Sequence, residues 1–190
     1  VEEKNTGEAT IGAGYSSSTK ASIQLGLSEQ NFLGKGQQLK AEANFGKETT
    51  LYDISFAEPY LYDIDLYVKG DLYSEFQDSS SVNYETEKVG IGISLGFPLS
   101  YDERILTKYS LFNDKTIADS DATSYERMLA GTNTVSTAGY SFTSDKRNSP
   151  YKPSAGFKYV LTQDIAGLGG DSSFIKSTID YTYYKRISKQ

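Results

Sequence analysis

Polar and apolar residues alternate along most of this chain with a period of two. In the stretch 88–97, Val89, Ile91 and Ile93 share one face, and Lys88 and several glycines share the other. Such alternation is typical of β-strands that have one polar and one apolar face. It predicts strands at 8–15, 21–28, 38–45, 52–56, 64–72, 88–97, 104–112, 135–143, 155–161 and 175–183. The expected fold class is therefore all-β.

The connections between these strands differ in length. Tight turns are expected at 16–19 and 47–50, and long polar loops at 77–83, 113–131 and 165–173. Residues 31–34 suit a single helical turn that is closed by Gly34. No linker rich in Gly and Ser divides the chain, so we expect residues 1–190 to form one domain.

The composition excludes several classes of chemistry. The chain has 190 residues, no Cys, no His and a net charge of −6. Disulfides, thiolate metal sites and His-dependent nucleophilic catalysis are therefore impossible. A basic face for nucleic acid is not expected on so acidic a chain. Carboxylate pairs such as Asp119 and Asp121 are interpreted as surface charge, so we expect no metal, no cofactor and no enzyme activity.

Alternation does not reveal which face meets water. A soluble sandwich buries its apolar face, whereas a membrane barrel turns that face to lipid. Two features favour the membrane. Charged residues lie far inside the strands, among them Lys40, Glu42 and Asp71. Aromatic residues gather near predicted strand ends, where they would form interfacial girdles: Tyr15, Tyr52, Tyr60, Tyr62, Tyr73, Phe76, Phe97, Tyr101 and Tyr109. A soluble β-sheet module that binds lipid or protein remains the alternative from another class.

Several stretches carry a family resemblance. GAGY at 12–15 precedes a hairpin, and LSEQNFLGKGQ follows at 27–37. FAEPYL stands at 56–61 and DKRNSPYKPSAG at 145–156. In this order and spacing they resemble the barrel of the BamA family, which assembles β-barrel proteins in the bacterial outer membrane. The resemblance runs from about residue 7 to residue 184.

This resemblance implies an antiparallel transmembrane β-barrel in the bacterial outer membrane. The chain would hold about ten strands of a sixteen-stranded family barrel, and the periplasmic domains and C-terminal strands would be absent. The implied function is the insertion and folding of β-barrel proteins. The implied partners are outer-membrane lipid, unfolded outer-membrane protein clients and the lipoproteins of the assembly complex. A polypeptide-exporting barrel of a related transporter family and a plain porin remain alternatives.

The first predicted strand is the candidate site for client strands. Its residues Ile11, Gly12, Ala13, Gly14 and Tyr15 include two glycines, which weaken a strand. In the implied barrel this strand closes the seam, so a weak strand makes the seam easy to open. An open seam exposes backbone groups that a client strand can pair with. Alternatively, the glycines make room for a bulky neighbour or a bend. Open edges also suit a homo-oligomer.

A second group of candidate residues belongs to turns. Pro restricts the backbone and ends strand pairing, and Asp145 and Arg147 are placed to form an ion pair. We therefore expect a structural role for the whole group: Asn31, Phe32, Gly34, Gly36, Glu58, Pro59, Tyr60, Asp145, Arg147, Pro150, Pro153 and Gly156.

Overall fold

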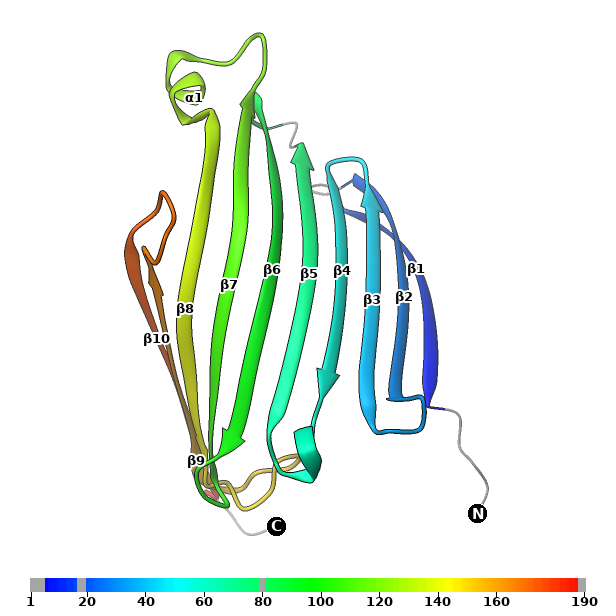
Figure 1. Ribbon diagram of the computed structural model, residues 1–190, viewed down its shortest axis with the longest axis vertical. Helices are drawn as coiled ribbons and strands as arrows, with labels where there is room; N and C mark the ends of the chain where they lie inside the picture. The colour runs from blue at the N-terminus through cyan, green and yellow to red at the C-terminus, as the bar shows by residue number, and fades with distance from the viewer. Residues whose placement is uncertain (1–5, 17–19, 79–80, 188–190) are drawn as a thin grey trace.

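The structure is a computed structural model that describes residues 6–16, 20–78 and 81–187. In this part of the chain, one antiparallel sheet contains ten strands in chain order (Figure 1). The strands are β1 (Gly7–Ser16), β2 (Lys20–Phe32), β3 (Gln37–Gly46), β4 (Thr49–Glu58), β5 (Tyr67–Asp78), β6 (Tyr84–Pro98), β7 (Glu103–Ala118), β8 (Gly131–Asp145), β9 (Ala155–Ala166) and β10 (Phe174–Lys185). The predicted all-β class and the predicted number of strands are confirmed.

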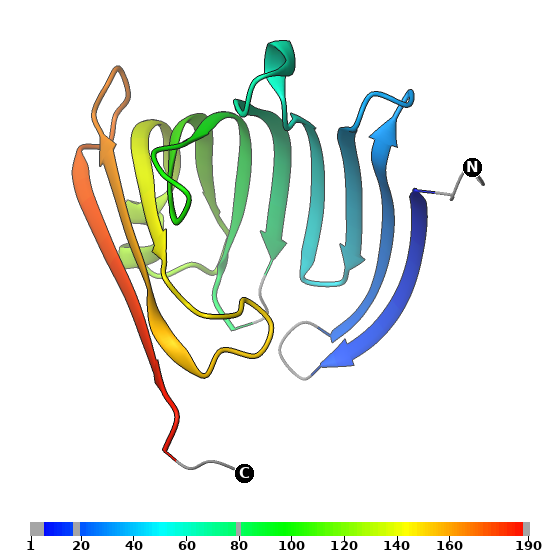
Figure 2. The ribbon, with the colours of Figure 1, turned by 90° about the horizontal axis from the view of Figure 1, so that it is seen from below.

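The sheet curves into an open trough (Figure 2). Each strand pairs with its neighbour in the sequence, so the twist of successive hairpins accumulates in one direction. Among the described strands, β1 pairs with β2 alone and β10 pairs with β9 alone. These two strands form the sides of the trough.

Charged side chains line the concave face of the trough. Lys108 of β7 reaches over β8 to Asp164 of β9, with 2.9 Å between Nζ and Oδ1. The residue between them is Gly139, where a Cβ atom would lie only 2.2 Å from Asp164 Oδ1. Lys40 and Glu42 of β3 form a further pair at 2.8 Å. The polar face predicted from the alternation is therefore the inner one.

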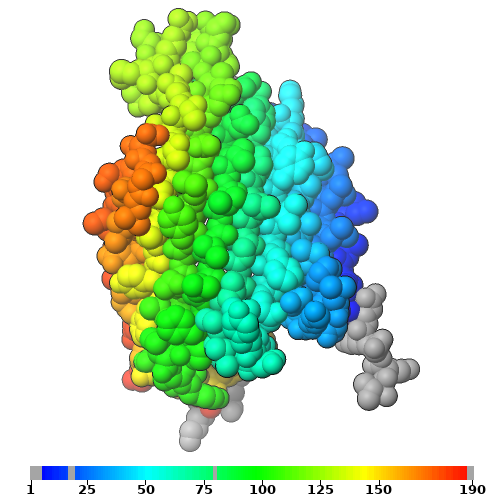
Figure 3. All heavy atoms as spheres, viewed as in Figure 1, coloured from blue at the N-terminus to red at the C-terminus, as the bar shows by residue number. Residues whose placement is uncertain are grey.

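The convex face carries the apolar side chains. The strand register aligns them across the sheet in rows, such as Ala9, Leu27, Ala41, Ile54, Leu72, Ile91 and Leu111. We call these outward-facing apolar residues the apolar belt. Figure 3 shows the convex face with no second layer over it. Ile23, Phe45 and Ile91 are all at least 41% exposed, and the buried apolar residues of the described chain are only Ala57, Ala122, Val135 and Ala166. The sealed interior of a soluble sandwich is not present in the described residues.

The predicted fifth strand starts too early. Ile64 lies in the turn before β5, which contains a 3₁₀ segment, Leu61–Asp63. Tyr62 and Asp63 both have positive φ values of about 60°, which lie outside the extended region that a regular strand uses. Figure 2 shows this turn projecting outward from the convex side.

The predicted loop at 113–131 is also partly wrong. Residues 113–118 continue β7, and α1 (Ser124–Leu129) follows. This part of β7 extends past the apolar belt, so no apolar alternation marks it, yet it still pairs with β6 and β8. A capping box begins α1, because the Thr123 side chain accepts from Glu126 N and Glu126 accepts from Thr123 N. The backbone N–H of Thr123, above all, lowers the pKa of the Glu126 carboxyl below its usual value.

Two smaller predictions are wrong as well. Asn31 and Phe32 are the last residues of β2, and residues 33–36 form turns rather than a helical turn, because Leu33, Gly34 and Gly36 all have positive φ. Tyr73 does not belong to a girdle. It shares the concave face with Asp71, and its ring lies over Gly90. Among the described residues, no helix has the length and apolar character needed to cross a membrane.

Candidate functional site

Within the described residues, β1 has no neighbouring strand on the side away from β2, and this edge includes all the residues predicted for client pairing. Ile11 and Tyr15 are 82% and 79% exposed, and they point to the convex side with Ala13. Pairing with β2 continues without a register shift from Gly7 opposite Glu29 to Ser16 opposite Lys20. No bulge therefore bends β1.

The two glycines of β1 are not required for packing. A Cβ atom at Gly12 would lie 3.7 Å from Gln24 Cβ, and one at Gly14 would lie 3.8 Å from Ser22 Oγ. These are ordinary van der Waals distances, unlike the 2.2 Å found at Gly139. On the β2 side, therefore, neither glycine makes room for a bulky neighbour. What they leave is a strand with few side-chain contacts on its concave face and a high conformational entropy when unpaired.

The predicted turn residues gather at one end of the sheet, although they are far apart in the sequence. The β2–β3, β4–β5 and β8–β9 turns all lie at the lower end in Figure 1, where the described chain also begins. We call this end, together with the β6–β7 turn, the turn rim.

The first part of the turn rim is held by side chains that bond to the backbone. Asn31 Oδ1 accepts a hydrogen bond from Gly36 N at 2.7 Å. The carboxylate of Glu58 accepts from Gln37 Nε2 at 2.9 Å and from Tyr60 N at 3.1 Å, which joins the two turns. The Phe32 ring meets the Phe56 ring edge-on, with 6.4 Å between centroids. These contacts connect the β2–β3 turn to the β4–β5 turn.

The β8–β9 turn is organised by an arginine and an asparagine. Arg147 donates from Nε and Nη2 to the two oxygens of Asp145 at 2.7 and 2.6 Å, and from Nη1 to Pro150 O. The hydrogen bonds to Asp145 raise the pKa of the Arg147 guanidinium, so the pair stays charged. Asn148 Oδ1 accepts from Ser154 N and Ala155 N at 2.9 and 3.0 Å and closes the turn.

Gly156, which was predicted to be a turn residue, is the second residue of β9 and packs tightly against this turn. Its φ is +99°, and a Cβ atom there would lie 2.1 Å from the carbonyl oxygen of Lys146. Pro150 and Pro153 lie in the same turn, outside the strands. Before these prolines, backbone pairing extends beyond Asp145 through hydrogen bonds from Lys146 N to Phe157 O and from Asn148 N to Ala155 O.

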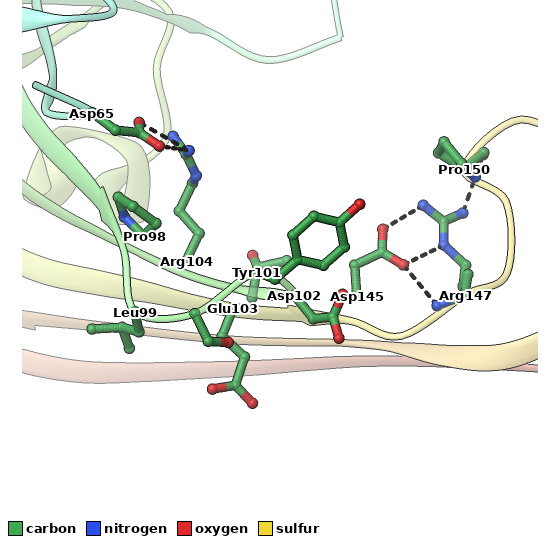
Figure 4. Close-up of a pocket in the computed structure, with 12 residues that line it drawn as sticks. Asp65, Pro98, Leu99, Tyr101, Asp102, Glu103, Arg104, Asp145, Arg147 and Pro150 are labelled. Atoms are coloured by element: carbon green, nitrogen blue, oxygen red, sulfur yellow. Dashed lines mark hydrogen bonds and ion pairs between the residues drawn. The ribbon is translucent and has the colours of Figure 1, made fainter.

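A groove of about 870 Å³ lies between the β6–β7 and β8–β9 turns (Figure 4). One side carries Arg104, which donates to both oxygens of Asp65 at 3.1 and 3.2 Å. The other side carries the Asp145–Arg147 pair, and Tyr101 stands between them. Both arginines are neutralised by their partners. Within the described residues, no group of three or more acidic side chains is placed to hold a metal ion.

Several residues that organise this structure were not predicted from the sequence. Asn148 lies inside the motif at 145–156. Asn is frequent in turns, and this preference could have indicated its role. The capping box of Thr123 and Glu126 was visible as a Thr-x-x-Glu spacing. No sequence signal indicates that the Asp164 side chain packs over Gly139, because this contact depends on the register of three strands.

Comparison with known proteins gives three findings. The model of the Omp85 superfamily domain matches residues 31–190. The outer membrane protein assembly factor BamA of Nitratidesulfovibrio vulgaris is 28% identical over 194 residues, which is 99% of this chain and 24% of that protein. The sorting and assembly machinery component 50 homolog of Mus musculus is 26% identical over 173 residues, covering 89% of this chain and 36% of that protein.

A solved structure has the same fold. The crystal structure of BamA from Haemophilus ducreyi lacking POTRA domains 1–3 matches with a TM-score of 0.74 and 21% identity. The match covers 95% of this chain and 37% of that chain. The present chain therefore spans between 24% and 37% of the length of these relatives.

Proposed function

The chain belongs to the Omp85 superfamily, and on that premise we propose that it forms the side of an assembly barrel that receives client strands. The resemblance to the BamA family that its motifs predict is confirmed. The predicted location in a bacterial outer membrane is also confirmed by these relatives. Its role belongs to outer-membrane protein assembly, which is the function named for the bacterial relatives.

The free, glycine-weakened edge of β1 is the single observation that carries the proposal. Unpaired N–H and C=O groups cost several kcal/mol each in hydrocarbon. A client strand that pairs with β1 satisfies these groups in both chains by β-augmentation. Because the β1 side chains make few contacts, the barrel's own closing strand is displaced at low cost.

The apolar belt is short at this side of the sheet, which also supports the proposal. On β1 it runs from Ala9 to Tyr15, about 20 Å along the strand, and on β6 from Val89 to Phe97, about 26 Å. A shorter belt favours a thinner bilayer beside it. Thinner lipid lowers the barrier to inserting the polar turns of a client.

The proposed mechanism needs no covalent step and no cofactor, so the chain acts as an insertase rather than an enzyme. Its partners are outer-membrane lipid, unfolded outer-membrane clients and assembly-complex lipoproteins. Residues 1–190 act as one partial barrel domain, and the turn rim holds the strand ends in register. A homo-oligomer that forms through open edges is the further arrangement that a free β1 permits.

The proposal predicts a specific crosslink in lipid vesicles. With Ala13→Cys, an unfolded outer-membrane β-barrel protein with one cysteine in its last strand should form a disulfide to position 13. The control is Ile93→Cys, which lies on the same convex face but in β6, a strand that is paired on both sides. The proposal fails if no position along β1 forms a disulfide, or if position 93 forms one equally well.

A further inference from the structure

β8 extends beyond its neighbour β9. The β8–β9 pairing ends at Thr137 opposite Ala166, whereas β8 continues to Gly131 and pairs there with β7. In the part of the chain that the structure describes, residues 131–136 therefore have a strand on one side and no strand on the other. We call this segment the β8 shoulder.

The loop after β9 bonds to the free side of the β8 shoulder. Gly167 N donates to Ser136 O at 3.3 Å, and Asp171 N donates to Thr134 O at 2.7 Å. The Asp171 carboxylate accepts from Thr134 N at 2.7 Å. Asp171 thus supplies one donor and one acceptor to Thr134, as a residue of a paired strand would. We call residues 167–171 the strap.

The strap is closely fitted to the β8 shoulder. Ser136 is fully buried, and its Oγ donates to Leu168 O at 3.0 Å and lies 2.9 Å from Tyr109 Oη. A Cβ atom at Gly170 would lie 2.6 Å from Thr134 O and 3.1 Å from Ser136 N. Only glycine lets the strap come this near to the strand.

The position of the β8 shoulder relative to the apolar belt explains why a strap is needed. The outward-facing residues of β8 are apolar at Ala138 and Tyr140, but polar at Thr132, Thr134 and Ser136. The β8 shoulder therefore lies just beyond the apolar belt, in water. A free strand edge in water is a template for pairing with another chain.

We propose that the strap is an edge guard that prevents the β8 shoulder from pairing with a second copy of this chain. Copies in one membrane have the same orientation, so two uncovered shoulders meet side by side as parallel strands. Asp171 blocks this contact by occupying the backbone groups of Thr134. This inference does not depend on client templating at β1.

The test compares two variants that remove the strap in different ways. Asp171→Ala deletes the acceptor for Thr134 N, and Gly170→Val pushes the strap away from Thr134 O. Both should raise amide hydrogen exchange at Thr134 about tenfold or more, as expected when one backbone hydrogen bond is lost. Asp121→Ala removes a charge from the neighbouring loop and should change nothing.

Pairing between copies is tested by adding Thr132→Cys to the unaltered chain and to each of the three variants. A short bis-maleimide then crosslinks neighbouring copies in lipid vesicles. Crosslinked dimers should increase several-fold in the Asp171→Ala and Gly170→Val backgrounds, but not with Asp121→Ala. The guard is wrong if exchange at Thr134 rises in both variants without more dimer, since the strap is then only a loop contact. The edge-guard proposal is also wrong if neither variant changes amide exchange at Thr134. It is wrong as well if Thr132→Cys with an unaltered strap gives as much crosslinked dimer as the two variants.

Discussion

Replacing Gly156 with alanine should lower the free energy of unfolding by about 3 kcal/mol or more, which combines backbone strain and overpacking. The new Cβ atom would lie 2.1 Å from the Lys146 carbonyl oxygen, and the φ of +99° is unfavourable for any L side chain. Neither atom can move without breaking the turn that Asn148 closes. Urea unfolding in lipid vesicles, followed by circular dichroism, measures the change.

Gly34→Ala is the matched control for this prediction. Gly34 also has a positive φ, +72°, but a Cβ atom there would meet nothing within 4 Å. Only the strain remains, so the expected cost is about 1 kcal/mol. If Gly34→Ala and Gly156→Ala lowered the free energy of unfolding equally, the close contact with Lys146 would not contribute to the loss at position 156.

Replacing Ile23 with lysine should cost about 2–3 kcal/mol, the penalty for a lysine on the lipid face of a barrel. Ile23 is 53% exposed on the convex face, between Ala13 of β1 and Phe45 of β3. Because it belongs to the apolar belt, its replacement carries a charge into hydrocarbon. The same urea unfolding experiment measures the loss.

Gln24→Lys controls for the charge itself. Gln24 is the next residue of β2, and it faces the concave side between Gly12 and Asn44. A lysine there stays in water, so its cost should be below about 0.5 kcal/mol. If both lysines were tolerated equally, the convex face would not lie against lipid.

Alternation was sufficient to predict the ten strands, because each crosses the apolar belt and must show an apolar face there. Residues 113–118 show where the rule stops. They extend β7 into water, where only backbone pairing with β6 and β8 holds them, and no periodicity results. The predicted start of the fifth strand at Ile64 was wrong for the opposite reason. Ile64 is an apolar residue in an outward turn, and its spacing from the next apolar residues matches the alternation of a strand.

The candidate site was predictable only where residue chemistry is local. Asp145 and Arg147 are two residues apart, so their pairing follows from the sequence. The contact between the strap and β8 is not predictable from the sequence. Thr134 and Asp171 meet only because β8 extends beyond the end of β9. The weakness of β1 could be inferred from its glycines, but their freedom from close contacts needed the register with β2.

In the membrane barrel, hydrocarbon lies against the convex face, and nitroxide scanning of β2 in lipid vesicles tests this most directly. Residues 21–28 would be labelled one at a time, and accessibility to oxygen and to a polar nickel chelate would be compared. The account predicts a period of two, with oxygen favoured at Ala21, Ile23, Leu25 and Leu27, and the chelate favoured at the intervening positions. If those apolar positions were instead shielded from both reagents, they would lie in a packed protein interior, and the membrane barrel would be contradicted.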